Sequence, residues 1–252
     1  MPPLLELIDV TRIYNEGSSS EVIAVNHVNL RIDTGRFVIL MGPSGSGKTT
    51  LLMLLGGLLK PTSGTVSLLG TEISRLSEKE LPYVRRRQIG FIFQGFNLFP
   101  ALTAVENVEA TLNVKEVRGQ KAEQQAKVLL EKVGLTARMH HLPEDLSGGE
   151  KQRVAVARAL AGEPPIILAD EPTAALDSKT GRTIIGLLKE LSQRENRLVF
   201  MVSHDNRILD YADEILYMND GMLLSHEDEE ASDRLRKQIM SSVPPPVPGW
   251  AE

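Results

Sequence analysis

The chain has 252 residues, enough for one large domain or two small ones, and 42% of them are hydrophobic, so a sizeable core can form. Lys and Arg total 28 against 33 for Asp and Glu, which excludes a global basic field for nucleic acid and makes any phosphate binding local. The absence of cysteine excludes disulfides, thiolate catalysis and cysteine-based zinc sites.

The sequence predicts a soluble chain. Its first ten residues, MPPLLELIDV, lack a basic region followed by a long apolar stretch, so a signal peptide is not expected. No run of about 18 consecutive apolar residues, the length that spans a bilayer, is present. Any membrane role is therefore expected to come through a partner.

The front of the chain predicts a small antiparallel sheet. Residues 11–33, TRIYNEGSSSEVIAVNHVNLRID, combine alternation of apolar and polar side chains with turn residues. The next apolar run, FVILM at 37–41, predicts a buried strand, and TTLLMLLGGLL at 49–59 has the apolar spacing of a helix.

Between that strand and that helix lies GPSGSGKTT, which fits the phosphate-loop pattern G-x-x-x-x-G-K-[ST]. Gly45 and Gly47 permit a close backbone approach, and the helix directs unpaired N–H groups and its positive end at phosphates. Lys48 is expected to place a charge between the β- and γ-phosphates, and the Thr49 hydroxyl to bind Mg²⁺. The other loop residues expected at the nucleotide are Gly42, Ser44, Ser46 and Thr50.

Two other interpretations of this loop fit the sequence less well. An ordinary glycine turn before a helix would not need the complete pattern in its strand–loop–helix context. A dinucleotide site needs G-x-G-x-x-G, and reading from Gly45 the sixth residue is Thr50, so that interpretation fails.

Residues 102–144 have a helical pattern without a strand signal, which predicts a helical insertion. The following stretch, LSGGEKQRVAVARAL at 146–160, predicts a helix opened by Ser147, Gly148 and Gly149, and thus a second anion site. A plain N-cap with Glu150 completing a capping box explains the serine. It does not explain two glycines, which weaken the start of a helix.

Two further apolar runs, PIILADE at 165–171 and RLVFMVSHD at 197–205, flank a helical segment at 178–194. This alternation predicts a parallel sheet with ligands at the carboxyl ends of its strands. Asp170 suits the coordination shell of Mg²⁺, and Glu171 suits orienting or deprotonating a water molecule. The alternative for this pair is a surface turn before Pro172.

The end of the chain changes in composition. Residues 226–238, HEDEEASDRLRKQ, are rich in charge, and VPPPVPGW follows at 243–250. We expect residues 226–252 to form an acidic terminal helix and a loose proline-rich tail.

The phosphate loop, LSGGE, IILADE, AALD at 174–177, Gln94 in FIFQ and His204 in VSHD occur in the order found in ATP-binding subunits of ABC transporters. The resemblance runs from about Leu5 to Gly221. In detail the motifs resemble the branch of lipoprotein-releasing and macrolide-type export ATPases, although amino-acid importers share the FNLFP region.

The resemblance implies an α/β fold, a P-loop NTPase of the ABC ATPase type. It would have a mainly parallel sheet core, an N-terminal antiparallel β subdomain and an inserted helical subdomain at about 95–160, all within a domain of residues 1–225.

The resemblance also implies roles for single residues. Tyr14 would stack on adenine, and Gln94 would lie near Mg²⁺ and the water molecule. Glu171 would be the catalytic carboxylate, and His204 would contact the γ-phosphate. Taken alone, Tyr14 is more often a packing residue, and His204 could be a capping residue.

In the same family, Ser147, Gly148 and Gly149 act on ATP held by the phosphate loop of the other subunit. Asp177 lies in the loop that crosses between subunits. The export branch often has asparagine where this chain has Ala175, so a side-chain hydrogen bond would be missing there. A serine hydrolase centred on Ser203 is not favoured, because its G-x-S-x-G elbow is absent.

Together these observations predict a Mg-ATP-hydrolysing subunit that dimerises around two ATP molecules and drives membrane-spanning permease subunits, in export or in lipid or lipoprotein extraction. Its expected place is peripheral, on the cytoplasmic face of the inner or plasma membrane, with no nucleic-acid partner. The alternatives are a soluble ABC ATPase that acts as a mechanical regulator, or the ATPase of an ABC importer. An ordinary P-loop kinase or GTPase leaves LSGGE and His204 unexplained.

A surface for the membrane partner is expected after Gln94, where Phe96, Leu98, Phe99 and Leu102 form an apolar cluster. Phe99 and Leu102 would line a groove for a short helix of the partner. The alternative is that all four residues pack inside the helical insertion.

Overall fold

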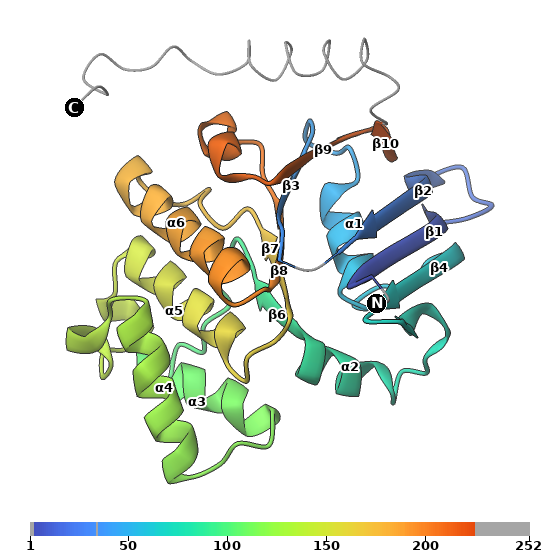
Figure 1. The fold of residues 1–252 in the computed structure, drawn as a ribbon. Helices are drawn as coiled ribbons and strands as arrows, with labels where there is room; N and C mark the ends of the chain where they lie inside the picture. Colours follow the sequence, from blue (N-terminus) through green and yellow to red (C-terminus); the bar gives the residue numbers. More distant parts are fainter. Residues whose placement is uncertain (1–2, 34, 225–252) are drawn as a thin grey trace, which may run out of the picture.

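Alternate side chains of the strand Phe37–Met41 (β3) point into two separate hydrophobic cores. Its first, third and fifth residues pack in one cluster, and Val38 and Leu40 pack in the other. Because successive side chains of a strand point to opposite faces, β3 lies in a sheet that is covered on both sides. The computed structural model, which describes residues 3–33 and 35–224, has this three-layer arrangement (Figure 1).

The central sheet has six strands in the order β10-β9-β3-β8-β7-β6. Every neighbouring pair is parallel except β9 with β10. The predicted mainly parallel core is thus confirmed. The remaining strands of this sheet are β6 (Ile89–Ile92), β7 (Ile166–Asp170), β8 (Leu198–Val202), β9 (Glu214–Asn219) and β10 (Met222–Leu224).

Helices α5 (Gly148–Leu160) and α6 (Ser178–Arg194) cover one face of the central sheet (Figure 1). Helices α3 (Ala104–Val114) and α4 (Gln120–Lys132) pack against α5 on the side away from the strands. Helix α6 covers the same residues as the helical segment predicted between the two apolar runs, since Asp177 caps its start.

Helix α1 (Lys48–Leu55) and a second sheet form the layer on the other face (Figure 1). This sheet is antiparallel, with four strands in the order β2-β1-β4-β5, and it confirms the predicted antiparallel unit at the front of the chain. Its strands are β1 (Leu5–Tyr14), β2 (Val22–Ile32), β4 (Ser63–Leu68) and β5 (Thr71–Glu72), and helix α2 (Leu81–Gln88) follows.

Helix α1 is shorter than its apolar pattern predicts. It ends at Leu55, and Gly57 has the left-handed φ of +59° that leads the chain away. A side chain at Gly56 would collide with the ring of Phe91, since its Cβ would lie 2.3 Å from the ring atom Cζ. The packing of the Phe91 ring against the end of α1 therefore disfavours a side chain at this position. The described part of the chain also has four short 3₁₀ helices: Ile73–Arg75, Thr136–Arg138, Pro143–Asp145 and Asn206–Tyr211 (η4).

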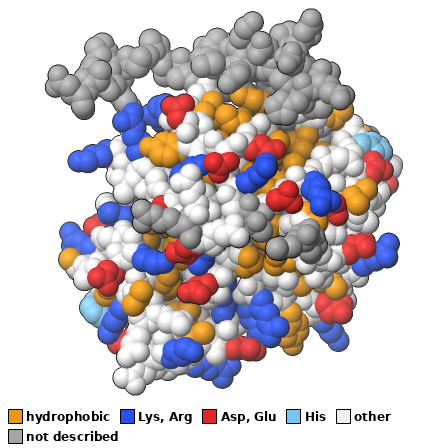
Figure 2. All heavy atoms as spheres, in the orientation of Figure 1, with side chains coloured by type: hydrophobic (Ala, Val, Ile, Leu, Met, Phe, Trp, Pro, Cys, Tyr) orange, Lys and Arg blue, Asp and Glu red, His pale blue; other side chains and the backbone are white. Residues whose placement is uncertain are grey.

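The expected acidic helix and proline-rich tail at 226–252 lie outside the described residues. Within residues 3–33 and 35–224, no helix is both long enough and apolar enough to span a bilayer. Figure 2 shows Lys, Arg, Asp and Glu side chains interspersed over one face of the molecule, with hydrophobic side chains between them.

Candidate functional site

The register of the parallel strands brings the predicted site residues to one edge of the sheet. Val202 of β8 is paired with Leu40 of β3 and with Asp170 of β7, and Ala169 of β7 is paired with Ile92 of β6. The strands therefore end at nearly the same level. The segments that carry Gly42, Glu171, His204 and Gln94 all begin there.

The loop before α1 is packed too tightly for side chains at two of its glycines. A Cβ at Gly42 would lie 2.2 Å from the carbonyl oxygen of Met218, and one at Gly47 would lie 2.0 Å from that of Ala24. Gly47 also has a left-handed φ of +102°. The turn between β9 and β10 is hydrogen-bonded to this loop, because Gly221 N–H donates to the Ser46 carbonyl at 3.0 Å.

The ammonium group of Lys48 lies inside this loop. Its Nζ donates to the carbonyl oxygens of Gly42 and Pro43 at 2.9 and 2.7 Å. Burial lowers the pKa of Lys48, while the charges of Glu171 and Asp170 oppose this shift. A buried cation held by neutral carbonyls, at the N-terminus of a helix, is suited to an anionic ligand.

Thr49, the second residue of α1, faces the end of β7. Its hydroxyl donates to Oδ1 of Asp170 at 3.3 Å. Burial raises the pKa of Asp170, the hydrogen bond from Thr49 lowers it, and the charge of Glu171 raises it further. A cation between these oxygens would remove the penalty on the charged carboxylate. The remaining loop residues Ser44 and Gly45 are exposed, and Thr50 is half-buried.

Glu171 and His204 meet across the ends of β7 and β8. Nδ1 of His204 lies 2.7 Å from one carboxylate oxygen of Glu171 and 2.8 Å from the other. Glu171 has a left-handed φ of +46°, a strained conformation of the kind that occurs at functional sites. Its N–H donates to the carbonyl of Val202 at 3.0 Å, which fixes this bend against β8.

Gln94 follows β6, and its side chain is exposed. The segment after it is held by two residues that the sequence interpretation did not single out. Asn107, fully buried in α3, accepts from Phe99 N–H at 2.8 Å and donates to the carbonyls of Phe99 and Leu102 at 3.1 and 2.8 Å. Arg158 of α5 donates to the Asn97 carbonyl and lies over the Phe99 ring, 5.7 Å from its centroid.

The predicted apolar cluster after Gln94 divides into two parts. Leu98 packs against the core beneath the helices, whereas 52% of Phe99 is exposed. Phe96 and Leu102 are half-buried. The interpretation that all four residues are core is therefore wrong for Phe99. The sequence signal for Asn107 is an asparagine within a predicted helical segment, and the signal for Arg158 is an arginine within the apolar segment VAVARAL. A polar side chain that becomes buried in such a segment is expected to be hydrogen-bonded.

Tyr14 is half-buried at the end of β1, where it pairs with Val22 of β2. The guanidinium of Arg12 lies over its ring at 4.9 Å from the centroid, a cation–π contact. The cation occupies one face of the ring, so an adenine base would have to stack on the other.

Ser147 and Gly148 are exposed at the start of α5. Ser147 and Glu150 form the capping box that their spacing in the sequence allows, with Ser147 N–H donating to the Glu150 carboxylate at 2.8 Å. Gly149 lies against α6, since a Cβ there would be 2.5 Å from the methyl group of Thr180. The second glycine is thus explained by packing as well as by ligand access.

Asp177 is exposed and caps α6 through hydrogen bonds of 3.1 Å from the N–H groups of Lys179 and Thr180. Ala175 lies beside the start of α5, because its carbonyl oxygen is 3.6 Å from the position of a Cβ on Gly148. The segment 146–149 and the segment 174–177 therefore form one surface of the chain.

Within one chain, the site residues fall into two groups. Lys48, Thr49, Asp170, Glu171 and His204 are joined by the contacts described above. The start of α5 is not joined to them, because α5 packs on one face of the central sheet and α1 on the other (Figure 1).

The chain is similar to a known family and to individual proteins of that family. The family model described as ABC transporter matches residues 25–174. The lipoprotein-releasing system ATP-binding protein LolD of Acinetobacter baylyi is 44% identical over 229 residues, which cover 88% of this chain and 98% of that protein. The macrolide export ATP-binding/permease protein MacB of Hyphomonas neptunium is 41% identical over 254 residues, which cover 100% of this chain and 39% of that protein.

A solved structure is similar over most of the chain. It is the dimer of the ATP-binding cassette MJ0796 of Methanocaldococcus jannaschii, in a post-hydrolysis state bound to ADP and Pi. It has a TM-score of 0.82 and 45% sequence identity, and the match covers 88% of this chain and 97% of that one.

Proposed function

The chain belongs to the ABC transporter family as an ATP-binding cassette, and from this premise we propose that two copies of it enclose two ATP molecules and hydrolyse them to drive a membrane-spanning partner. One observation carries the proposal. The phosphate loop and the exposed Ser147 lie at the ends of helices on opposite faces of the sheet, so a second copy is needed to bring Ser147 over the loop.

ATP binding is supported by the loop before α1. The buried ammonium of Lys48 donates to neutral acceptors, the carbonyls of Pro43 and Gly42 at 2.7 and 2.9 Å and the Ser46 hydroxyl at 3.5 Å, and phosphate oxygens would offer it charged ones. The glycine backbone and the N-terminus of α1 add N–H donors. Tyr14 would stack on the adenine with the ring face opposite Arg12.

Thr49 and Asp170 fit a Mg²⁺ ion. Their oxygens lie 3.3 Å apart, one hydroxyl and one carboxylate, and Mg²⁺ typically takes one or two such protein ligands together with phosphate oxygens. Gln94 is the further candidate ligand. When bound, Mg²⁺ neutralises charge on the phosphates during phosphoryl transfer.

Hydrolysis is supported by the pair at the ends of β7 and β8. Glu171 would orient the water that attacks the γ-phosphorus in line and accept its proton, while the bond between phosphorus and the β,γ-bridging oxygen breaks. His204, whose Nδ1 is 2.7 Å from Glu171, would direct its other ring nitrogen at the γ-phosphate. Lys48 and the partner's helix N-terminus would offset negative charge in the transition state.

The membrane partner would contact the segment after Gln94. Phe99 is 52% exposed, its backbone is hydrogen-bonded to Asn107 and Arg158 lies over its ring, so these contacts would favour one orientation of the exposed ring. A preordered apolar side chain suits the groove-binding mode in which a partner inserts a short helix.

Export or lipid and lipoprotein extraction is the transport class that the relatives favour, since one is named a lipoprotein-releasing ATP-binding protein and another a macrolide export protein. The chain would then be peripheral, on the cytoplasmic face of the inner or plasma membrane. The domain is proposed to end at about residue 225 and to include the helical subdomain at about 95–160.

A mixing experiment tests the shared site. A Lys48→Ala chain lacks a working phosphate loop, and a Ser147→Arg chain carries a bulky cation where it would meet the other chain's ATP. Each variant alone should hydrolyse ATP slowly. In a mixed dimer, the phosphate loop of the Ser147→Arg chain meets an unmodified Ser147, so mixing the two should restore hydrolysis.

A mixture that remains as slow as its components would contradict a site built from two chains. Hydrolysis by the Lys48→Ala chain at the wild-type rate would contradict the nucleotide site itself. Circular dichroism of each variant serves as the folding control, because loss of the Ser147 cap is expected to cost about 1 kcal/mol.

A further inference from the structure

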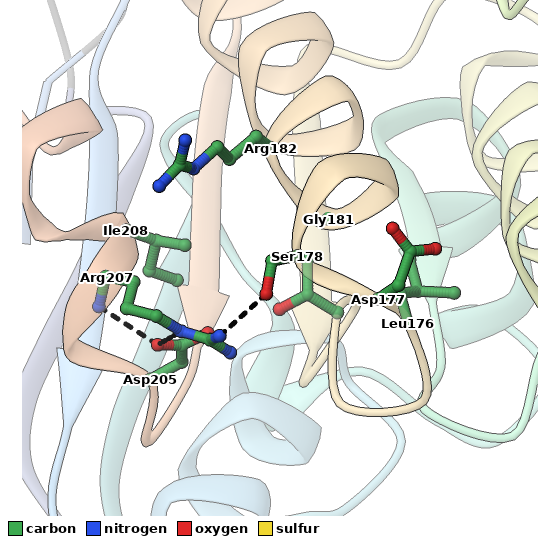
Figure 3. A pocket seen from close by; sticks show the side chains of 9 residues that line it. Leu176, Asp177, Ser178, Gly181, Arg182, Asp205, Arg207 and Ile208 are labelled. Atoms are coloured by element: carbon green, nitrogen blue, oxygen red, sulfur yellow. Dashed lines mark hydrogen bonds and ion pairs between the residues drawn. The ribbon is translucent and has the colours of Figure 1, made fainter. Parts of the chain in front are cut away.

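One side chain connects the segment that follows β8 with the segment that follows β7. Arg207, in η4, donates through Nε and Nη2 to the two carboxylate oxygens of Asp205, each at 2.8 Å. Its Nη1 donates to the hydroxyl of Ser178 at 2.9 Å (Figure 3). Ser178 is the first residue of α6 and directly follows Asp177.

The Asp205 end of this connection is fixed by the backbone. Asp205 caps η4 by accepting from Arg207 N–H at 2.9 Å, and its own N–H donates to Ser203 Oγ at 3.0 Å. Ser203 is buried and donates its N–H to the carbonyl of Leu40 in β3 at 3.1 Å. Burial opposes the charge of Asp205, but the hydrogen bonds from Arg207 leave its pKa below the ordinary value, so the pair is ionised at neutral pH.

The Ser178 end belongs to the surface proposed to meet the other subunit. Its neighbour Asp177 is exposed, and Thr180, one turn into α6, contacts Gly149 at the start of α5. The same two segments are also connected at the reacting groups, through Glu171 and His204. Arg207 thus supplies a second connection between the segments, away from Glu171 and His204.

The Arg207 side chain is 51% exposed and that of Asp205 only 21%, and a bidentate pair of this kind adds geometric specificity as well as stability. The planar guanidinium can engage a carboxylate with two donors and still direct a third at Ser178, which a lysine cannot do. The arrangement therefore fixes the geometry between the two segments.

We propose that Arg207 is a positioning residue, which holds the His204 segment at a set distance from the Asp177 loop so that the subunit contacting Asp177 determines where His204 lies. The inference rests on the proposed function, because it assumes that Asp177 faces a second copy of the chain. It adds a route, Asp177 to Ser178 to Arg207 to His204, by which closure of the dimer reaches the reacting groups.

A double-mutant cycle on the full chain tests this route. The variants are Arg207→Gln, Ser178→Ala and the pair of them, with kcat and KM for Mg-ATP, nucleotide affinity and melting temperature measured for each. Each single variant should lower kcat about fivefold to tenfold, and the double variant should be no slower than either single one, since coupled residues are non-additive. KM, nucleotide affinity and melting temperature should stay near the wild-type values.

Two further variants make the result specific. Ser178→Thr keeps a hydroxyl at the same position and should keep the wild-type kcat. Arg31→Gln removes an arginine of similar exposure, which pairs with Glu6 at 3.1 Å on the antiparallel sheet, and it should change nothing.

The inference is overturned if the effects of the single variants multiply in the double variant, if the loss of kcat follows a loss of melting temperature, or if neither variant changes kcat. These outcomes differ from failure of the proposed function. Failure of the proposed function would appear as a lack of ATP hydrolysis by the wild-type chain or by the mixed variants. Arg207 is unchanged in both experiments.

Discussion

His204 Nδ1 lies 2.7 Å from Oε2 of Glu171, so the two groups proposed to handle the attacking water and the γ-phosphate already contact each other. Only 18% of the Glu171 side chain is exposed, against 66% of His204. The carboxylate is therefore sheltered at the bottom of the site, and the imidazole covers it on the solvent side.

The first prediction concerns this carboxylate. Glu171→Gln keeps the shape of the side chain but cannot accept a proton, so turnover should fall by at least about 100-fold. ATP that is bound but not hydrolysed should hold two chains together, and size-exclusion chromatography with Mg-ATP should show a dimer. Glu131→Gln, on the exposed face of α4, is the matched control. A variant that remains monomeric in millimolar Mg-ATP would argue against the shared site.

The second prediction concerns Lys48. Lys48→Ala removes the buried cation beside the loop carbonyls of Gly42 and Pro43, and it should abolish ATP binding or turnover. Isothermal titration and steady-state hydrolysis measure the two effects. The exposed Lys60→Ala is the control. Near-wild-type affinity together with near-wild-type turnover in Lys48→Ala would reject this loop as the phosphate site.

The third prediction separates two roles of Tyr14. Tyr14→Ala should weaken ATP binding by about 1–3 kcal/mol, by analogy with base–aromatic stacking, while Tyr14→Phe and Tyr14→Trp retain most of the affinity. Fluorescence titration with a labelled nucleotide measures the change. Equal losses in the Phe and Ala variants would point instead to a hydrogen bond from the hydroxyl.

The fourth prediction concerns the partner surface. Phe99→Glu places a charge on the exposed side chain and should abolish co-purification with the membrane partner, while nucleotide binding and melting temperature stay near wild type. Leu98→Ala is the contrasting variant: it removes packing from the core and should lower stability. Leu102→Glu, at a half-buried position, should weaken co-purification. Retained co-purification by Phe99→Glu would move the surface elsewhere.

The fifth prediction uses a buried cation outside the site. Lys115 Nζ has no hydrogen-bond partner within the described part of the chain. Burial, and then the charge of Arg197, lower the pKa of Lys115 from 10.5 to about 8. Between these values the unfolded chain binds more protons than the folded one, so this group makes the free energy of unfolding rise with pH from about 8 to 10.5.

Lys115→Met removes the buried charge at similar length. It should raise the free energy of unfolding at pH 7 by about 1–3 kcal/mol and flatten the rise above pH 8. Urea denaturation at neutral and at alkaline pH measures both effects, with Lys121→Met on the exposed face of α4 as control. Destabilisation at pH 7, or an unchanged pH dependence, would mean that the ammonium is better solvated than this geometry indicates.

Local sequence determined the parts of the fold whose signals lie within a few residues. The strand at 37–41 and the helix at 178–194 match their predicted bounds. Five consecutive apolar residues favour a buried strand, and helical spacing of apolar residues after the N-cap Asp177 favours a helix that begins at Ser178. The phosphate-loop pattern likewise identified Lys48 and Thr49, since all its residues are adjacent. Strands β4, β5, β6, β9 and β10 were missed. β4, β6 and β9 pair with strands far away in the sequence, and β5 and β10 are short strands that form hairpins with β4 and β9.

The sequence by itself thus determined which residue types stand at the site, and the resemblance of motif order determined their expected roles. Tertiary structure alone decided which of them touch. The contact of Glu171 with His204 and that of Ser178 with Arg207 each join residues separated by about 30 positions. Both contacts depend on the parallel pairing of β7 with β8. The apolar pattern of a strand predicts which of its faces is buried, but it does not predict which other strand lies beside it. The separation of Ser147 from the phosphate loop has the same origin, because only the packing of α1 and α5 on opposite faces of the sheet places them apart.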